Sequence, residues 1–60
     1  MQTIVAILFT YSWGGYCVRY RDGTTESLSP KQLLVRVGEA EYYRLAVIAH
    51  RLPGHWHEVA

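Results

Sequence analysis

The chain has 60 residues, of which 50% are hydrophobic and 18% are charged, and this length suits one small domain over residues 1–60. A chain of this size buries only about 60% of the surface that its unfolded form exposes, so it has a thin core and little material for an internal pocket. Six Lys and Arg residues against five Asp and Glu residues give a net charge of +1. This balance excludes a strongly basic protein that nucleic acid or an anionic membrane would attract, and the small size counts against an enzyme.

Cysteine usage and the first apolar segment bear on the cellular compartment. Cys17 is the only cysteine, so the chain can form neither an internal disulfide nor a cysteine-based zinc cage, which fits a reducing cytoplasm. The segment Thr3–Phe9 has no Lys or Arg before it and is too short to span a bilayer, so we interpret it as a strand rather than an export signal. We therefore expect a cytoplasmic protein, and we expect that a homodimer or a tight partner complex would support so small a core.

Two glycine-containing dipeptides, Gly14-Gly15 and Asp22-Gly23, interrupt the first half of the chain. Both are favoured in two-residue hairpin turns. They predict a three-stranded antiparallel meander with strands at about 3–13, 16–21 and 24–28. Counting outward from the turns sets the register. The predicted opposing pairs are Trp13 with Tyr16, Tyr11 with Val18, Phe9 with Tyr20, Tyr20 with Thr25, and Arg19 with Glu26.

This register separates the strand residues by polarity, although the turns are predicted from the two glycine-containing dipeptides alone. The predicted aromatic face holds Val5, Ile7, Phe9, Tyr11, Trp13, Tyr16, Val18 and Tyr20. The predicted polar face holds Thr10, Ser12, Cys17, Arg19, Arg21, Thr24 and Glu26, with Leu8 and Leu28 at its margins. A shift by one residue would place Arg19 and Arg21 among the aromatic rings, which is costly for charges without a buried partner.

A first helix is predicted at about 30–37. Ser29 can cap it, Pro30 suits its first position, and Gln32 stands three residues after the cap. Leu28 and Leu33 occupy the positions of a hydrophobic staple, and Gly38 suits the C-terminal end of the helix.

A second helix is predicted at about 39–51, with a C-terminal tail at 53–60. Its apolar stripe contains Tyr42, Leu45, Ala49 and Leu52, and Pro53-Gly54 ends it. In the alternative interpretation, residues 44–52 form a strand that pairs with residues 55–59, because Leu45, Val47 and Ile48 also suit a sheet. In the helical interpretation the fold is an α+β domain in which two helices pack on the aromatic face of the three-stranded meander.

Residue types that could carry chemistry are present but poorly arranged for it. The zinc-ligand types are His50, His55, His57, Glu58 and Cys17. His55 and His57 would point the same way from an extended segment, but no second spaced pair accompanies them, so we expect no metal and no cofactor. Cys17 has no predicted neighbouring base, and Gly14-Gly15 has neither a following helix nor a Lys for phosphate. The chain is therefore not expected to be an enzyme.

The polar face also permits a nucleic-acid interpretation. A three-stranded sheet with a helix behind it resembles, in strand layout, the plant-type DNA-binding domains that lay a sheet in the major groove and the arm-binding domains of phage integrases. That resemblance implies DNA or RNA binding through Arg19 and Arg21. Those families are clearly basic, whereas Glu26 is predicted here to neutralise Arg19.

Surplus Tyr and Trp residues favour a protein-binding role instead, since these side chains are enriched at interfaces. The expected partner-binding residues are Trp13, Tyr16, Arg19, Arg21, Glu26, Tyr43 and Trp56. The leading hypothesis is a small inhibitor or modulator that blocks a larger protein or ribonucleoprotein complex by steric occlusion. It is similar in this respect to phage-encoded anti-CRISPR proteins directed at a bacterial defence complex. Five of the six basic residues are Arg, which fits a phage of a GC-rich bacterial host.

Overall fold

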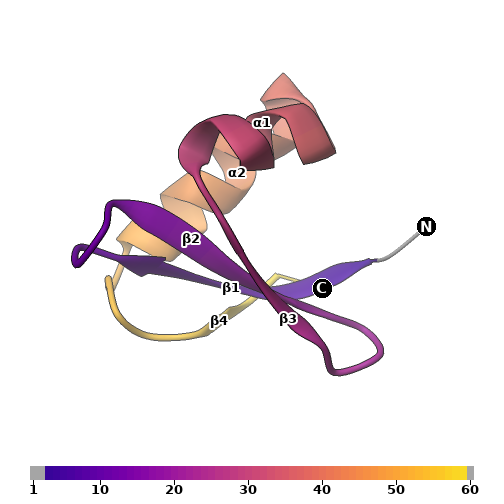
Figure 1. The fold of residues 1–60 in the computed structure, drawn as a ribbon, viewed down its shortest axis with the longest axis horizontal. Helices are drawn as coiled ribbons and strands as arrows, with labels where there is room; N and C mark the ends of the chain where they lie inside the picture. The colour runs from indigo at the N-terminus through magenta and orange to yellow at the C-terminus, as the bar shows by residue number, and fades with distance from the viewer. Residues whose placement is uncertain (1–2, 60) are drawn as a thin grey trace.

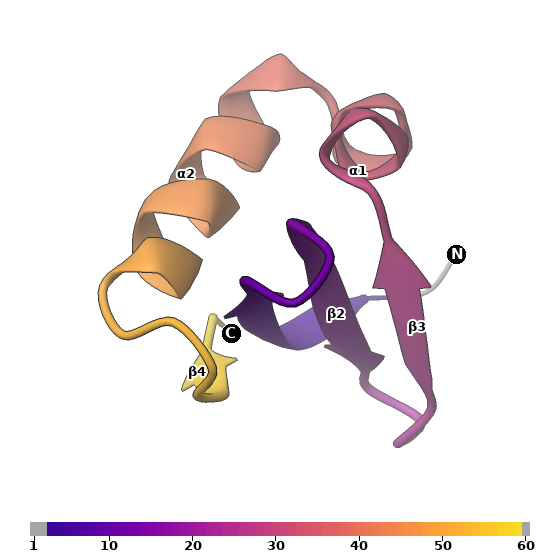
Figure 2. The same ribbon diagram turned by 60° about the vertical axis from the view of Figure 1, so that its left-hand side comes forward.

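The computed structural model describes residues 3–59 and shows an α+β fold with two helices on one face of an antiparallel sheet (Figures 1 and 2). Its elements are β1 (Ile4–Thr10), β2 (Gly15–Tyr20), β3 (Thr25–Leu28), α1 (Pro30–Val37), α2 (Glu39–His50) and β4 (His57–Glu58). The strand order is β3-β2-β1-β4. The predicted α+β class and the meander are thus confirmed, and the sheet has one strand more than predicted.

The fourth strand comes from the predicted C-terminal tail (53–60), whose last residue lies outside the described residues. In β4, His57 lies opposite Ile7 and Glu58 lies opposite Ala6. This pairing covers the edge of β1 that the meander leaves open, and it satisfies backbone groups that would otherwise be exposed at that edge.

The first hairpin turns through a four-residue loop (11–14) rather than through Gly14-Gly15. The Gly14 N–H donates to the Thr10 carbonyl (3.1 Å), and β2 already begins at Gly15. A type I′ turn needs positive φ at both central residues, but only Gly14 has it, at 70°. Gly15 instead provides space, because the Trp13 ring lies where a Cβ at position 15 would be.

The longer loop changes the register of β1 and β2. Phe9 lies opposite Tyr16, not opposite Tyr20 as predicted. The predicted partner Tyr20 is four residues from the observed partner Tyr16. A register shift by an even number of residues keeps every side chain on its face of the sheet. A β-bulge between Ile4 and Ala6 then brings Ile4, in place of Val5, against the core.

The second hairpin has a three-residue loop (21–23). The Tyr20 N–H donates to the Thr24 carbonyl (2.8 Å), and the Gly23 N–H donates to the Tyr20 carbonyl (2.9 Å). Gly23 has φ of 92°, the left-handed conformation that ends three-residue hairpin loops. The Asp22 carboxylate stabilises this loop by accepting hydrogen bonds from the Thr24 N–H (3.0 Å) and hydroxyl (2.7 Å).

One extra loop residue reverses the faces of β3. Arg19 lies opposite Thr25, and Glu26 lies opposite Val18, so the predicted Arg19–Glu26 pair is wrong. An odd shift exchanges the two faces of a strand. Glu26 and Leu28 therefore lie on the helix side of the sheet, where Leu28 is buried.

The core lies between this face and the helices. It contains Ile7, Phe9, Tyr16, Val18, Tyr20, Leu28, Leu33, Leu45 and Ala49. Tyr11 and Trp13, which were predicted to lie in the first strand on the aromatic face, are 78% and 50% exposed in the first loop. Their predicted place in the strand is wrong because β1 ends before them, at Thr10.

The first helix begins and ends where its local signals predict. The Ser29 hydroxyl accepts from the Gln32 N–H (3.1 Å), and the Gln32 side chain accepts from the Ser29 N–H (2.9 Å), which completes a capping box. α1 ends before Gly38 and buries Leu33 against the sheet.

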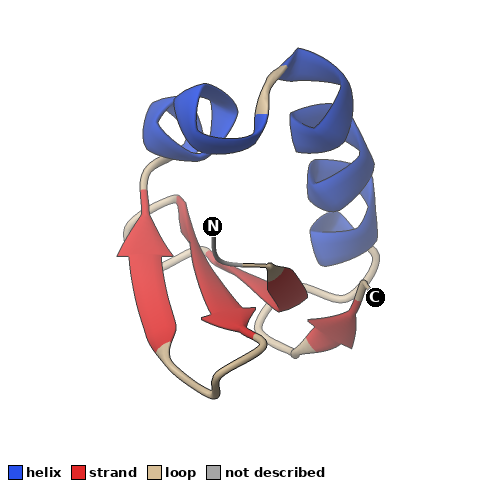
Figure 3. Ribbon diagram, turned by 90° about the vertical axis from the view of Figure 1, so that its right-hand side faces the viewer, coloured by secondary structure: helices blue, strands red, loops and turns tan. Residues whose placement is uncertain are grey.

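Residues 39–50 form α2, so the alternative strand at 44–52 is wrong. Glu39 and Glu41 occupy the first turn and His50 the last, which suits the helix dipole at both ends. α2 buries Leu45 and Ala49, and Figure 3 shows it beside α1 above the sheet. Among residues 3–59, neither helix has the length and apolar character that a bilayer crossing requires.

Candidate functional site

Large apolar side chains are exposed at several places in the described part of the chain. They are Tyr11, Trp13, Leu34, Val35, Tyr43, Val47, Leu52 and Trp56. Single exposed apolar residues are ordinary, whereas continuous groups mark interaction surfaces. Exposed side chains that lie close to one another are therefore the candidates for an interaction surface.

One group of side chains lies on the outer face of α2 and on the first hairpin loop, and the Phe9 ring links its two parts. Tyr43 and Val47 are four residues apart on the helix, and His50 follows three residues after Val47, so the three share one face. The His50 ring packs on Phe9 at 4.0 Å between centroids, and Phe9 contacts Tyr11 edge-on at 5.2 Å. We call Tyr43, Val47, His50 and Tyr11 the aromatic stripe.

Buried side chains hold the stripe in place. The Tyr16 hydroxyl and His50 Nε2 form a hydrogen bond of 3.0 Å, and the Tyr42 ring contacts both Tyr16 and Tyr43. Tyr16 is only 3% exposed, so the prediction that it contacts a partner is wrong: it is a core residue that positions His50. Burial raises the pKa of Tyr16 to about 12.

Trp13 lies in the same loop as Tyr11, with its ring over Gly15. It is half exposed, as expected for a contact residue at the end of the hairpin. Tyr43, also predicted as a contact, is exposed within the aromatic stripe. These two predicted contacts therefore lie on the loop and on the helix that together form the stripe.

A second group occupies the opposite face of the sheet, where β4 lies beside β1. The Arg19 guanidinium lies 5.1 Å from the centroid of the Trp56 ring and 3.3 Å from Glu58 Oε1. Ala6, which lies opposite both Arg19 and Glu58 in the ladder, is fully buried. Arg19 and Trp56 thus contact each other, and they connect the C-terminal segment to the sheet.

A third group lies between β3 and α1. Arg36 donates to Glu26 Oε1 (2.8 Å) and to the Tyr20 hydroxyl (2.8 Å), and that hydroxyl donates to Glu26 (2.5 Å). The Arg36 guanidinium holds the pKa of Glu26 below its usual value, and burial raises the pKa of Tyr20. The expected placement of Glu26 on the polar face is therefore wrong, because its partner is Arg36.

The seven predicted contacts do not form one surface. Arg21 is exposed in the loop between β2 and β3, whereas Trp13 lies in the loop between β1 and β2, and Figure 1 shows these two loops at opposite ends of β2. Sequence reasoning missed Tyr11, Val47 and His50. The predicted apolar face of the second helix, with Tyr42, Leu45 and Ala49, indicates that Val47 is exposed. The helical period places Val47 on the outer face of the helix, together with Tyr43.

The predicted metal-ligand types are dispersed. Within residues 3–59, no three His, Cys, Asp or Glu side chains gather closely enough to hold a metal ion. His50 contacts Tyr16, the His57 ring lies 3.1 Å from the Leu52 carbonyl, and Cys17 contacts Ser27.

The chain matches no protein-family model, no curated protein and no solved structure. The functional conclusion therefore depends on the geometry of the described residues.

Proposed function

We propose that this protein is a small protein-binding inhibitor or modulator that uses the aromatic stripe to cover a surface of a larger protein or ribonucleoprotein complex. The observation that carries the proposal is the exposure of Tyr43 and Val47, each 61%, and of Tyr11, 78%. A folded chain gains nothing in stability from leaving such side chains in water, whereas an interface gains from burying them.

The rigidity of the stripe supports this role. His50 is held by the Tyr16 hydroxyl and by the Phe9 ring, and Tyr43 is backed by Tyr42. Aromatic side chains that are already ordered lose little conformational entropy on binding, so more of the contact energy becomes affinity. Binding of this kind blocks a partner by occupying space, without a chemical step.

The distribution of charge favours protein over nucleic acid as the partner. Arg19, Arg36 and Arg44 each form an ion pair, with Glu58, Glu26 and Glu41. Cations that already have a carboxylate partner have less to gain from phosphate contacts. DNA or RNA binding through Arg19 and Arg21 is the alternative that the experiment below must separate.

The target class that we propose is a bacterial defence complex, which a phage-encoded inhibitor of this size would occlude. The test is to mix the purified chain with purified CRISPR interference complexes and to measure co-elution and the loss of target-DNA binding by each complex. We expect one complex to retain the chain and to lose its DNA target.

The matched variants are Tyr43→Ser with Val47→Ser, and Arg21→Ala. The double variant should lose at least about tenfold in affinity, because it removes two apolar contacts worth about 1 kcal/mol or more each. Arg21→Ala should bind like the wild type. If Arg21→Ala binds weakly, and the chain itself retains duplex DNA at low salt, the nucleic-acid alternative replaces this proposal. If no complex distinguishes the double variant from the wild type, the stripe is not the binding surface.

A further inference from the structure

β3 is an edge strand with free backbone groups. The Tyr20 N–H donates to the Thr24 carbonyl, so this opposing pair is hydrogen-bonded. Hydrogen-bonded and non-bonded pairs alternate along an antiparallel ladder. Glu26 and Leu28 therefore bond toward β2, whereas the N–H and C=O groups of Thr25 and Ser27 point away from the sheet. Such an edge is a template for an added strand.

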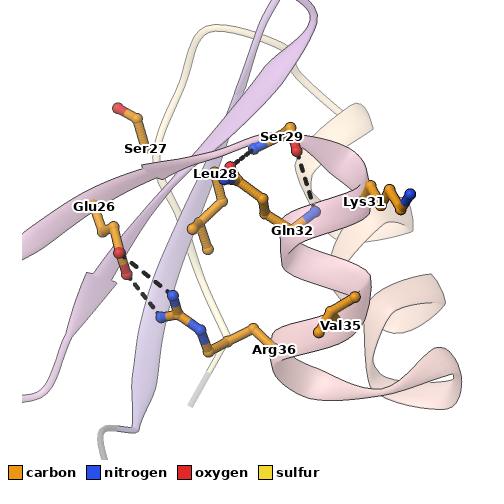
Figure 4. A pocket seen from close by; sticks show the side chains of 8 residues that line it. All are labelled: Glu26, Ser27, Leu28, Ser29, Lys31, Gln32, Val35 and Arg36. Carbon is orange, nitrogen blue, oxygen red and sulfur yellow. Dashed lines mark hydrogen bonds and ion pairs between the residues drawn. The ribbon is translucent and has the colours of Figure 1, made fainter.

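A groove of about 420 Å³ adjoins this edge, between β3 and α1 (Figure 4). Ser27 and Leu28 line it from the strand, and Lys31, Val35 and Arg36 line it from the helix. Val35 is 79% exposed, although it is a β-branched apolar residue. A strand laid beside β3 would place alternate side chains toward Val35 and the remaining ones toward solvent.

The groove has an excess of positive charge. Arg36 is balanced by Glu26, whereas Lys31 forms no ion pair among the described residues. The first turn of α1 contains no acidic residue that would offset the positive end of the helix dipole. An acidic side chain in a bound segment would therefore be complementary to the groove.

We propose that the groove binds an extended, acidic segment of a partner protein, which adds to the sheet as a strand beside β3. This second binding site is separate from the aromatic stripe and does not depend on it. Backbone hydrogen bonds to Thr25 and Ser27 would supply the alignment, and Lys31 and Val35 would select side chains that are acidic or apolar.

A second copy of the chain is a poorer occupant. Symmetric pairing of two β3 strands with Thr25 against Ser27 would set the two Glu26 carboxylates directly opposite each other, which is destabilising. Pairing Ser27 with Ser27 would require the Ser29 N–H, which already donates to Gln32. Pairing Thr25 with Thr25 would require the Gly23 N–H, which already closes its own turn.

The test is an NMR titration of the protein with a short, capped peptide of alternating valine and glutamate residues, and with a matched valine–lysine peptide. We expect the glutamate peptide to slow hydrogen exchange at the Thr25 and Ser27 amides, and to bind at least about tenfold more tightly than the lysine peptide. Equal binding of both peptides, or no protection of these two amides, would overturn the proposal.

Three variants separate the groove from other surfaces. Ser27→Pro removes an outward N–H that no ladder bond uses, so the edge strand should tolerate it while losing the glutamate peptide. Lys31→Glu changes only an exposed side chain, and it should reverse the preference toward the lysine peptide. Tyr43→Ser should leave peptide binding unchanged, so failure of the stripe would be distinguishable from failure of the groove. If the native mass corresponds to two chains and Ser27→Pro reduces it to the mass of one chain, two β3 strands pair with each other. That result would overturn the proposal that a partner segment occupies the groove.

Discussion

Replacing Leu33 with alanine should remove much of the stability of the fold, because this side chain connects α1 to the sheet. Leu33 is fully buried and belongs to the single core cluster of the described residues. A buried Leu→Ala change costs about 3 to 5 kcal/mol, which combines the lost apolar transfer with the cavity that is left behind. At about 0.05 to 0.15 kcal/mol per residue, the whole fold is stable by only about 3 to 9 kcal/mol.

The matched control lies two residues away on the same helix. Val35 is largely exposed, so Val35→Ala should change the free energy of unfolding by no more than about 0.5 kcal/mol. Urea unfolding followed by circular dichroism measures both variants, and a common denaturant slope shows that the comparison is valid. Should the two substitutions cost the same, α1 would not pack on the sheet through Leu33, and the groove beside β3 would lose its helical wall.

Three further outcomes follow from individual contacts. Because burial raises the pKa of Tyr16 to about 12, the unfolded chain ionises this phenol first, and stability should fall as pH rises from 10 toward 12. In thermal unfolding, Tyr16→Phe should lose less stability than the wild type over this pH range. Arg36 lowers the pKa of Glu26, so this carboxylate stabilises the fold above its unfolded pKa of about 4.5 and the effect is lost in acid. Glu26→Gln should accordingly lose less stability than the wild type between neutral pH and pH values below about 4. Gly15→Ala should displace the Trp13 ring and shift tryptophan fluorescence to longer wavelength, whereas an unchanged spectrum would contradict the contact.

The candidate surfaces were predictable only in part. Composition and helix periodicity predict Trp13 and Tyr43 as contacts, and the structure shows both side chains exposed. Tyr16 was misplaced, and the contribution of His50 was missed. Both errors have one cause: His50 is 34 positions from Tyr16 in the chain, and no local pattern reports a contact across that separation.

The helices and the faces of β1 and β2, apart from Ile4 and Val5 at the bulge, were determined by the sequence alone, because their signals are local. Ser29, Pro30 and Gln32 define the start of α1 within four residues, and alternation in β1 and β2 tolerates an even shift in register. Loop lengths, by contrast, do not follow from the glycine-containing dipeptides. The Trp13 ring lies over Gly15 in the four-residue first loop, and the hydrogen bonds of Asp22 and Gly23 stabilise the three-residue second loop.

That second loop determines which side of the sheet Glu26 occupies. The same glycine-containing dipeptide suits a two-residue or a three-residue loop, and the burial of Leu28 with the Glu26–Arg36 pair stabilises the longer one. The pairing of β4 with β1 is likewise a long-range choice, since an open sheet edge accepts any segment that can reach it. Local signals specify the helices of this protein, whereas contacts between distant segments join His50 of α2 to Phe9 and Tyr16 of the sheet and pair β4 with β1.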